Sequence, residues 1–158
     1  MNKMQWKLEF YDRFCRHEAE LTQLYRELYH NDMAAFDRFA DMLYDAYTAR
    51  PEALKLMDRA REAHGDWYKG HDLVGMLMYV NAFAGTLQGV REKLGYIEDC
   101  GVNYLHLMPL LESPKGRSDG GYAVSDFRKV QPELGTMEDL EHLADDCREK
   151  SISLCLDF

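Results

Sequence analysis

The first part of the chain carries apolar side chains at three- and four-residue steps, which is the period of an amphipathic helix. Such stripes cover about residues 3–29, 33–47 and 51–64, and they are rich in aromatic residues. Asp32 is a suitable N-cap for the second stripe. Stripes of this kind pack against one another far more often than they bind a cofactor. We therefore predict a helical N-terminal domain over residues 1–70.

Beyond residue 70 the apolar runs become short, and they alternate with helical patterns. Strands are predicted at 77–83, 102–108 and 151–158. Helices are predicted at 87–100 and from Thr136, whose hydroxyl can cap the helix. Strands separated by helices form parallel sheets with right-handed crossovers. The pattern over the second predicted domain therefore indicates an α/β fold.

Two architectures fit this order of elements. One is an open, doubly wound sheet, and the other is the beginning of a (β/α)₈ TIM barrel. No G-x-G-x-x-G motif follows the first predicted strand, where the sequence is Phe83-Ala84-Gly85-Thr86. Dinucleotide binding, a frequent function of the open sheet, therefore loses its main support.

The connection over residues 109–135 is unusually long for an α/β unit, in which such loops usually have about 2–6 residues. It leaves the carboxyl end of a predicted strand, which is where barrel enzymes place their active sites. This position favours a functional loop over a decorative one.

The centre of that loop reads Asp119-Gly120-Gly121-Tyr122. The glycines permit a tight turn and a close approach of a ligand to the backbone. A carboxylate accepts hydrogen bonds from sugar hydroxyls, and a tyrosine ring offers a flat face to the C–H side of a sugar. The motif therefore indicates a carbohydrate site, and a plain β-turn with a surface tyrosine is the alternative.

Composition narrows the classes of partner. The 158 residues have a net charge of −9, with 46% apolar and 30% charged residues, which is typical of a globular protein. No basic cluster is present to neutralise phosphates, so nucleic acid is not an expected partner. No apolar run approaches the roughly 20 residues of a membrane span, and no signal peptide is recognisable. The four cysteines lack metal-ligand spacing, so we expect free thiols in the cytoplasm, and neither a metal nor a cofactor.

The second half of the chain resembles the α-amylase superfamily (glycoside hydrolase family 13), and within it the amylosucrase and sucrose-hydrolase branch. The residues that carry the resemblance are Tyr79 to Gly85, Tyr104 to Pro109, Ser118 to Ser125, Arg128, Pro132, Leu134 to Thr136, and Asp139-Leu140. The helical segment in front also matches this branch, whose members carry a helical N-terminal domain.

The resemblance implies a (β/α)₈ barrel and a retaining mechanism, in which an Asp nucleophile forms a glucosyl-enzyme and a Glu acts as acid and base. In amylosucrases the glucosyl group passes from sucrose to an α-1,4-glucan, so these two carbohydrates are the expected partners. By motif match, Asp119 and Tyr122 belong to the substrate-binding pocket. Asp157 matches a residue that supports the site. His106 is interpreted as a packed strand histidine.

The family's catalytic carboxylates come from later strands, so the resemblance places no catalytic residue in this chain. We predict an N-terminal helical domain at 1–70 and an incomplete barrel of three βα units at 71–158. Three strands cannot close a barrel, and the third would expose a bare edge. We therefore expect a fragment of a longer enzyme that is inactive alone. There are two alternatives. One is a hydrolase of sucrose or another α-glucoside, and the other is a non-catalytic remnant that serves as an interaction module. The oligomeric state stays open.

Overall fold

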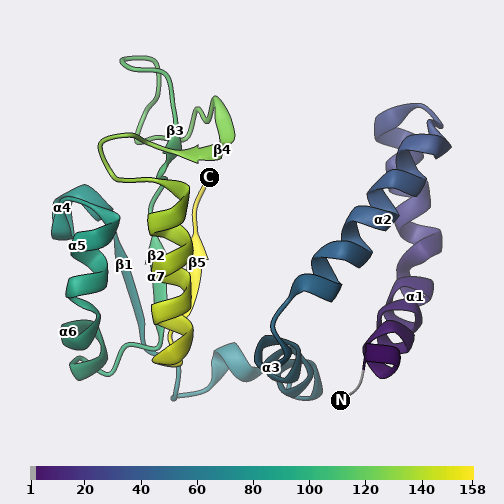
Figure 1. The fold of residues 1–158 in the computed structure, drawn as a ribbon, viewed down its shortest axis with the longest axis horizontal. Helices are drawn as coiled ribbons and strands as arrows, with labels where there is room; N and C mark the ends of the chain where they lie inside the picture. Colours follow the sequence, from purple (N-terminus) through teal and green to yellow (C-terminus); the bar gives the residue numbers. More distant parts are fainter. Residues whose placement is uncertain (1–2) are drawn as a thin grey trace. The chain divides into compact units, whose positions relative to one another are not determined.

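The computed structural model describes residues 3–158, and its contacts divide into two compact units, Met1–Gly65 and Asp66–Phe158. The first unit contains three helices, α1 (Lys3–Tyr29), α2 (Met33–Ala49) and α3 (Glu52–Ala63) (Figure 1). They confirm the predicted helical segments. The assignment of two domains, 1–70 and 71–158, stays a prediction.

The helical unit is held together by aromatic rings and by ion pairs. On α1, Phe10 packs edge-on against Tyr44 of α2, with ring centroids 5.2 Å apart. The buried Lys55 lies with its ammonium 5.2 Å from the ring of Trp6 and 4.8 Å from that of Tyr47. Such cation–π contacts stabilise a buried cation without an ion-pair partner. The aromatic stripes of the sequence are therefore packing surfaces.

The second unit is a parallel three-stranded sheet with its helices, as predicted. It begins with a short 3-10 helix, η1 (Trp67–Lys69). The sheet strands are β1 (Gly75–Met78), β2 (Tyr104–Leu107) and β5 (Ser153–Leu156), in the order β1-β2-β5. The helices are α4 (Val80–Ala84), α5 (Leu87–Glu92), α6 (Leu94–Asp99) and α7 (Met137–Glu149).

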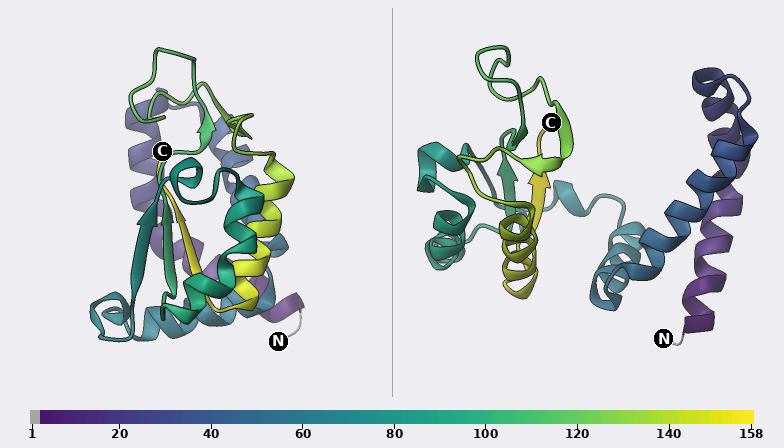
Figure 2. Two further views of the ribbon diagram at one scale, coloured as in Figure 1. Left: turned by 90° about the vertical axis from the view of Figure 1, so that its left-hand side faces the viewer. Right: turned by 45° about the horizontal axis from the view of Figure 1, so that its top comes forward.

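The helices α5, α6 and α7 lie on one side of the sheet (Figure 2). On this face Leu105 and Leu107 of β2 are fully buried, together with Val90 of α5 and Leu143 of α7. A doubly wound sheet would carry helices on both faces, whereas a barrel carries them outside only. The arrangement, with strands in sequential order, is that of the first βα units of an incomplete barrel.

The opposite face of the sheet would be the interior of a closed barrel. Leu77, His106 and Cys155 face this side, and they lie in register across the three strands. Leu77 is 61% exposed, while His106 and Cys155 are half-buried.

Two predicted elements were wrong in part. The apolar run predicted as a strand over 77–83 is a strand only to Met78, and α4 begins at Val80. Val80 is buried and Phe83 half-buried, which is a helical spacing. In addition, the predicted helix 87–100 is interrupted at Lys93, which separates α5 from α6.

The connection 109–135, predicted as a loop, contains two short antiparallel strands, β3 (Leu111–Glu112) and β4 (Asp126–Val130). Leu111 pairs with Val130, and Glu112 pairs with Asp126 across an irregularity in the register. Val130 is buried, so the pair fixes both ends of the loop onto the core. Residues 113–125 form a single loop between β3 and β4.

The assignment of a buried and an exposed side of the sheet can be tested by truncating one side chain on each side. Leu143→Ala should lower the free energy of unfolding by about 2–5 kcal/mol, because the residue is fully buried between α7 and the sheet. Urea denaturation followed by circular dichroism measures the loss. Leu77→Ala, at a 61% exposed position on the other face, is the control and should cost far less. Equal losses would contradict the assignment of the faces.

Candidate functional site

The candidate site lies at the carboxyl ends of the three parallel strands. Tyr79 directly follows β1, His106 lies within β2, and Asp157 directly follows β5. Because parallel strands end at the same edge of a sheet, these side chains come together there. The loop between β3 and β4 supplies Asp119 and Tyr122 to the same edge.

Two side chains converge on the carboxylate of Asp157. The hydroxyl of Tyr122 donates a hydrogen bond of 2.7 Å to Asp157 Oδ2. Nε2 of His106 lies 3.7 Å from the same oxygen. The backbone N–H of Asp157 donates to the carbonyl of Leu107 at 3.0 Å, which fixes the position of the carboxylate against β2. Asp157 therefore links the loop to the sheet.

The two glycines of the loop explain how Tyr122 reaches that carboxylate. Gly120 and Gly121 have φ values of 61° and 92°, a region that favours glycine. A Cβ on Gly121 would lie 3.0 Å from Cβ of Pro109, so the loop packs tightly against the end of β2. The backbone N–H of Tyr122 donates to the carbonyl of Asp119 at 3.2 Å and closes the turn.

Asp119 is exposed on this turn. Within residues 3–158 its carboxylate has no hydrogen-bond or ion-pair partner, so it is available to a ligand or to a cation from elsewhere. Tyr122 is 49% exposed and can present its ring while its hydroxyl stays bound to Asp157. The turn therefore combines a free carboxylate with an oriented aromatic ring.

The electrostatics of the site keep the Tyr122 hydroxyl protonated. Its hydrogen bond to Asp157 raises the pKa of Tyr122 above 10.0, and partial burial and the negative charge of Asp157 act in the same direction. A raised pKa means that the folded state favours the neutral phenol. This contribution to stability is fully present below about pH 10 and is lost as the pH rises through the folded-state pKa.

Sequence reasoning missed two members of this group. His106, interpreted as a packed strand histidine, is half-buried in β2, and its position beside Asp157 was not predicted. The alternation of side chains along β2 was the available signal. His106 lies between the buried Leu105 and Leu107 and therefore faces the other side of the sheet. Tyr79 was assigned to a strand interior, whereas it follows the strand, with its hydroxyl close to Gly120.

No group of three or more metal-ligating side chains occurs within residues 3–158. In the same part of the chain, no helix has the length and apolar character needed to cross a membrane.

The comparison with protein families decides the family of this chain. The model of the alpha-amylase catalytic domain matches residues 17–158, which is most of the sequence. The chain belongs to the alpha-amylase family. The resemblance in strand β2 and its loop is thereby confirmed at the level of the family, and the parallel sheet is part of its barrel.

Named relatives of this family act on several α-glucosides. Maltase A1 of Drosophila melanogaster is 45% identical over 74 residues, which cover 47% of this chain and 12% of that protein. An oligo-1,6-glucosidase of Bacillus cereus is 38% identical over 74 residues, covering 47% of this chain and 13% of the relative. The chain thus spans about an eighth of the length of these relatives.

The similar solved structures also include alpha-amylase family enzymes. A family GH13_31 enzyme aligns with a TM-score of 0.53 at 32% identity, over 58% of this chain and 18% of that one. A MutB mutant in complex with the substrate sucrose aligns with a TM-score of 0.50 at 30% identity, over 55% of this chain and 16% of its own. The similarity is therefore to members of the alpha-amylase family, over less than a fifth of the length of each solved chain.

The link between Tyr122 and Asp157 predicts a change that titration can detect. Asp157→Asn should lower the pKa of Tyr122 towards 10.0, because it replaces the hydrogen bond to a carboxylate by a weaker one to an amide and removes the negative charge beside the phenol. NMR titration of chains with ¹³C-labelled tyrosine measures this pKa. Asp119→Asn removes an exposed carboxylate from the same turn and should leave it unchanged. An unchanged pKa of Tyr122 in Asp157→Asn would exclude the carboxylate of Asp157 as the cause.

Proposed function

We propose that this chain is the N-terminal part of a retaining, sucrose-acting glucosyltransferase of the amylosucrase type, which transfers glucosyl groups from sucrose to an α-1,4-glucan. The observation that carries the proposal is the turn from Asp119 to Tyr122, bound through Asp157 at the carboxyl end of the sheet. This is the end of a barrel at which family members bind and cleave their substrates.

Each residue of the turn has a separate part in this proposal. Tyr122 stacks its exposed ring on the C–H face of the glucosyl unit, and its hydroxyl is held by Asp157 so that the ring does not rotate away. The free carboxylate of Asp119 accepts sugar hydroxyls or pairs with an arginine that closes the pocket floor. Asp157 supports the site and is not in contact with the reacting carbon.

The chemistry of glycosyl transfer requires further groups. A retaining enzyme uses two carboxyl groups about 5–5.5 Å apart, one as nucleophile and one as acid and base. By the motif match, Asp119 and Asp157 occupy neither role. We propose therefore that residues 1–158 bind one side of the sugar and do not turn it over, and that the helical segment 1–70 forms a separate domain in front of the barrel.

A second candidate is a hydrolase of sucrose or another α-glucoside. The curated relatives named above are a maltase and an oligo-1,6-glucosidase, which favours this candidate, while the structure with bound sucrose favours a sucrose-acting enzyme. A non-catalytic remnant that serves as an interaction module is the third. We also propose a cytoplasmic location, in which the exposed thiols Cys15 and Cys100 stay reduced.

Turnover assays separate these candidates. The purified 158-residue chain should release no fructose from sucrose and no glucose from maltose above a buffer blank. A polypeptide that extends this chain through the later barrel strands should release fructose from sucrose and lengthen an α-1,4-glucan. Release of glucose from maltose, without glucan synthesis, would support the hydrolase instead. Turnover of sucrose by the 158-residue chain would contradict the assignment of its roles.

Variants of the extended polypeptide test the site itself. Tyr122→Ala should reduce kcat/KM for sucrose about 100-fold or more, because the glucosyl unit loses the surface that orients it. Tyr96→Ala removes a ring that is 58% exposed on α6, away from the strand ends, and should leave kcat/KM near the unmodified value. Equal effects of the two variants would contradict a role of Tyr122 in binding.

A further inference from the structure

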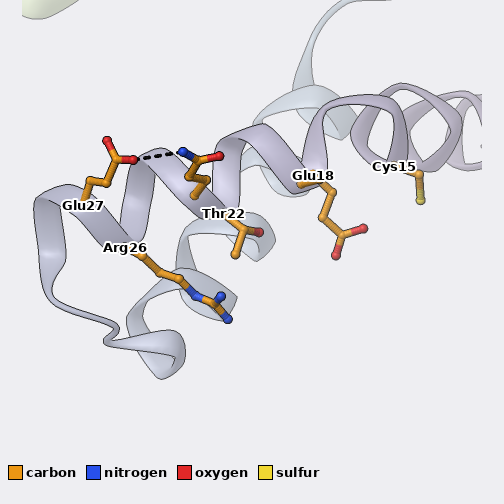
Figure 3. A pocket seen from close by; sticks show the side chains of 7 residues that line it. Cys15, Glu18, Thr22, Arg26 and Glu27 are labelled. Carbon is orange, nitrogen blue, oxygen red and sulfur yellow. Dashed lines mark hydrogen bonds between the residues drawn. The ribbon is translucent and has the colours of Figure 1, made fainter.

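A shallow depression on the surface of helix α1 is lined by residues of that helix alone, among them Cys15, Thr22 and Arg26 (Figure 3). Sites for small molecules enclose most of their ligand, which a single helix cannot do. The carboxyl ends of the parallel strands are different, because side chains from several elements border them. One of these side chains, Tyr79, has a hydroxyl that the contacts around Asp157 do not use.

Tyr79 lies on the inner side of the sheet, at the end of β1. Its backbone is still extended, with φ −84° and ψ 130°, so side chains continue to alternate and Tyr79 faces the same side as Leu77. The carbonyl of Met78 accepts a hydrogen bond of 2.9 Å from the N–H of Met108. The carbonyl of Tyr79 accepts one of 3.0 Å from the N–H of Phe83 in α4. The backbone at Tyr79 is therefore fixed by a strand pairing before it and by a helix after it.

The hydroxyl of Tyr79 lies beside Gly120, in the turn that carries Tyr122. A Cβ added to Gly120 would lie 3.3 Å from the hydroxyl oxygen of Tyr79 and 3.5 Å from two carbons of the Tyr122 ring. The two tyrosines therefore approach the same glycine from different elements. The absence of a side chain at this position leaves room for both, and they border a common space.

The two tyrosine hydroxyls differ in what they bind. That of Tyr122 donates a hydrogen bond of 2.7 Å to Asp157. That of Tyr79 has no hydrogen-bond partner within residues 3–158, and the residue is 39% exposed. A phenolic hydroxyl can both donate and accept a hydrogen bond. Tyr79 therefore offers a free polar group beside a ring whose own hydroxyl is occupied.

We propose that Tyr79 is a third substrate-contacting residue, whose hydroxyl forms a hydrogen bond with one hydroxyl of the glucosyl unit that stacks on Tyr122. This inference rests on the proposed function of the turn. A sugar whose face lies on Tyr122 carries its hydroxyls around its rim, and Tyr79 stands at that rim. A site that hydrogen-bonds a substrate hydroxyl rejects an analogue without it, because the protein group is then left unpaired. Tyr79 thereby selects sugars that carry a hydroxyl at the contacted position.

Tyr79→Phe separates a bond to the sugar from a packing role, because it keeps the ring and removes only the hydroxyl. In the extended polypeptide it should lower kcat/KM for sucrose about tenfold. Tyr96→Phe is the matched control, since it removes the hydroxyl of a ring that is 58% exposed on α6, and it should leave kcat/KM unchanged. Circular dichroism checks that both variants stay folded. An unchanged kcat/KM in Tyr79→Phe, or an equal loss in the two variants, would overturn the proposal.

Substrates that lack single hydroxyls identify the contact. The unmodified polypeptide and Tyr79→Phe are compared on sucrose analogues whose glucosyl unit lacks the hydroxyl at position 2, 3, 4 or 6. For one of these analogues the tenfold difference between the two proteins should disappear, because the variant and the analogue remove the same bond. A difference that persists for every analogue would overturn the contact with the sugar.

Maltose separates this inference from the proposed function. Maltose and sucrose share the glucosyl unit, so Tyr79→Phe should have the same effect on both. Turnover of maltose alone would contradict the sucrose-acting glucosyltransferase, while a tenfold loss in Tyr79→Phe on maltose would still support the contact. Turnover of sucrose with no loss in Tyr79→Phe would overturn the contact and leave the proposed function in place. Turnover of neither sugar by the extended polypeptide would overturn both.

Discussion

The pairing of β2 with a parallel strand on each side is the constraint on which the rest of the second unit depends. Met76, Leu105 and Leu154 lie in register across the sheet, and so do Leu77, His106 and Cys155. A slip of one residue in either pair would turn every side chain of that strand to the other face. The buried Leu105 and Leu107 exclude a slip of one residue in β2, because it would turn them away from α5 and α7. The same alignment brings His106 and Asp157 together.

The sequence predicts those parts of the fold that are encoded locally. Helix α7 is an example, because it begins with a capping box. The backbone N–H of Asp139 donates to the hydroxyl of Thr136, and the backbone N–H of Thr136 donates to the carboxylate of Asp139. The α4 segment was predicted wrongly because five residues carry too little periodicity to separate a helix from a strand. The pairing of Glu112 with Asp126 was missed because it depends on contacts between distant residues.

In the candidate site, too, the features that depend on neighbouring residues were predicted, and those that depend on contacts between distant residues were not. Asp119 and Tyr122 were selected from a motif of four residues, and the turn that joins them is local. The contact between Tyr122 and Asp157 spans 35 residues of sequence, and no spacing rule indicates it. It follows only when the strand ends meet at one edge. For this reason the motif was enough to predict the residues of the turn, whereas the orientation of Tyr122 is explained only by the arrangement of the sheet.

In the proposed function, the turn from Asp119 to Tyr122 and the supporting Asp157 form one wall of a carbohydrate pocket in this alpha-amylase family chain. Its free carboxylate and oriented ring suit binding, and the supporting hydrogen bond preorganises the ring before a sugar arrives. Preorganisation of this kind reduces the cost of ordering the site on binding.

The most direct measurement is a double-mutant cycle on the free energy of unfolding, with Tyr122→Phe, Asp157→Ala and the double variant. If the hydrogen bond links the loop to the sheet, the double variant should lose less stability than the sum of the two single losses. Strictly additive losses would contradict it, because Tyr122 and Asp157 would then not stabilise the fold through each other.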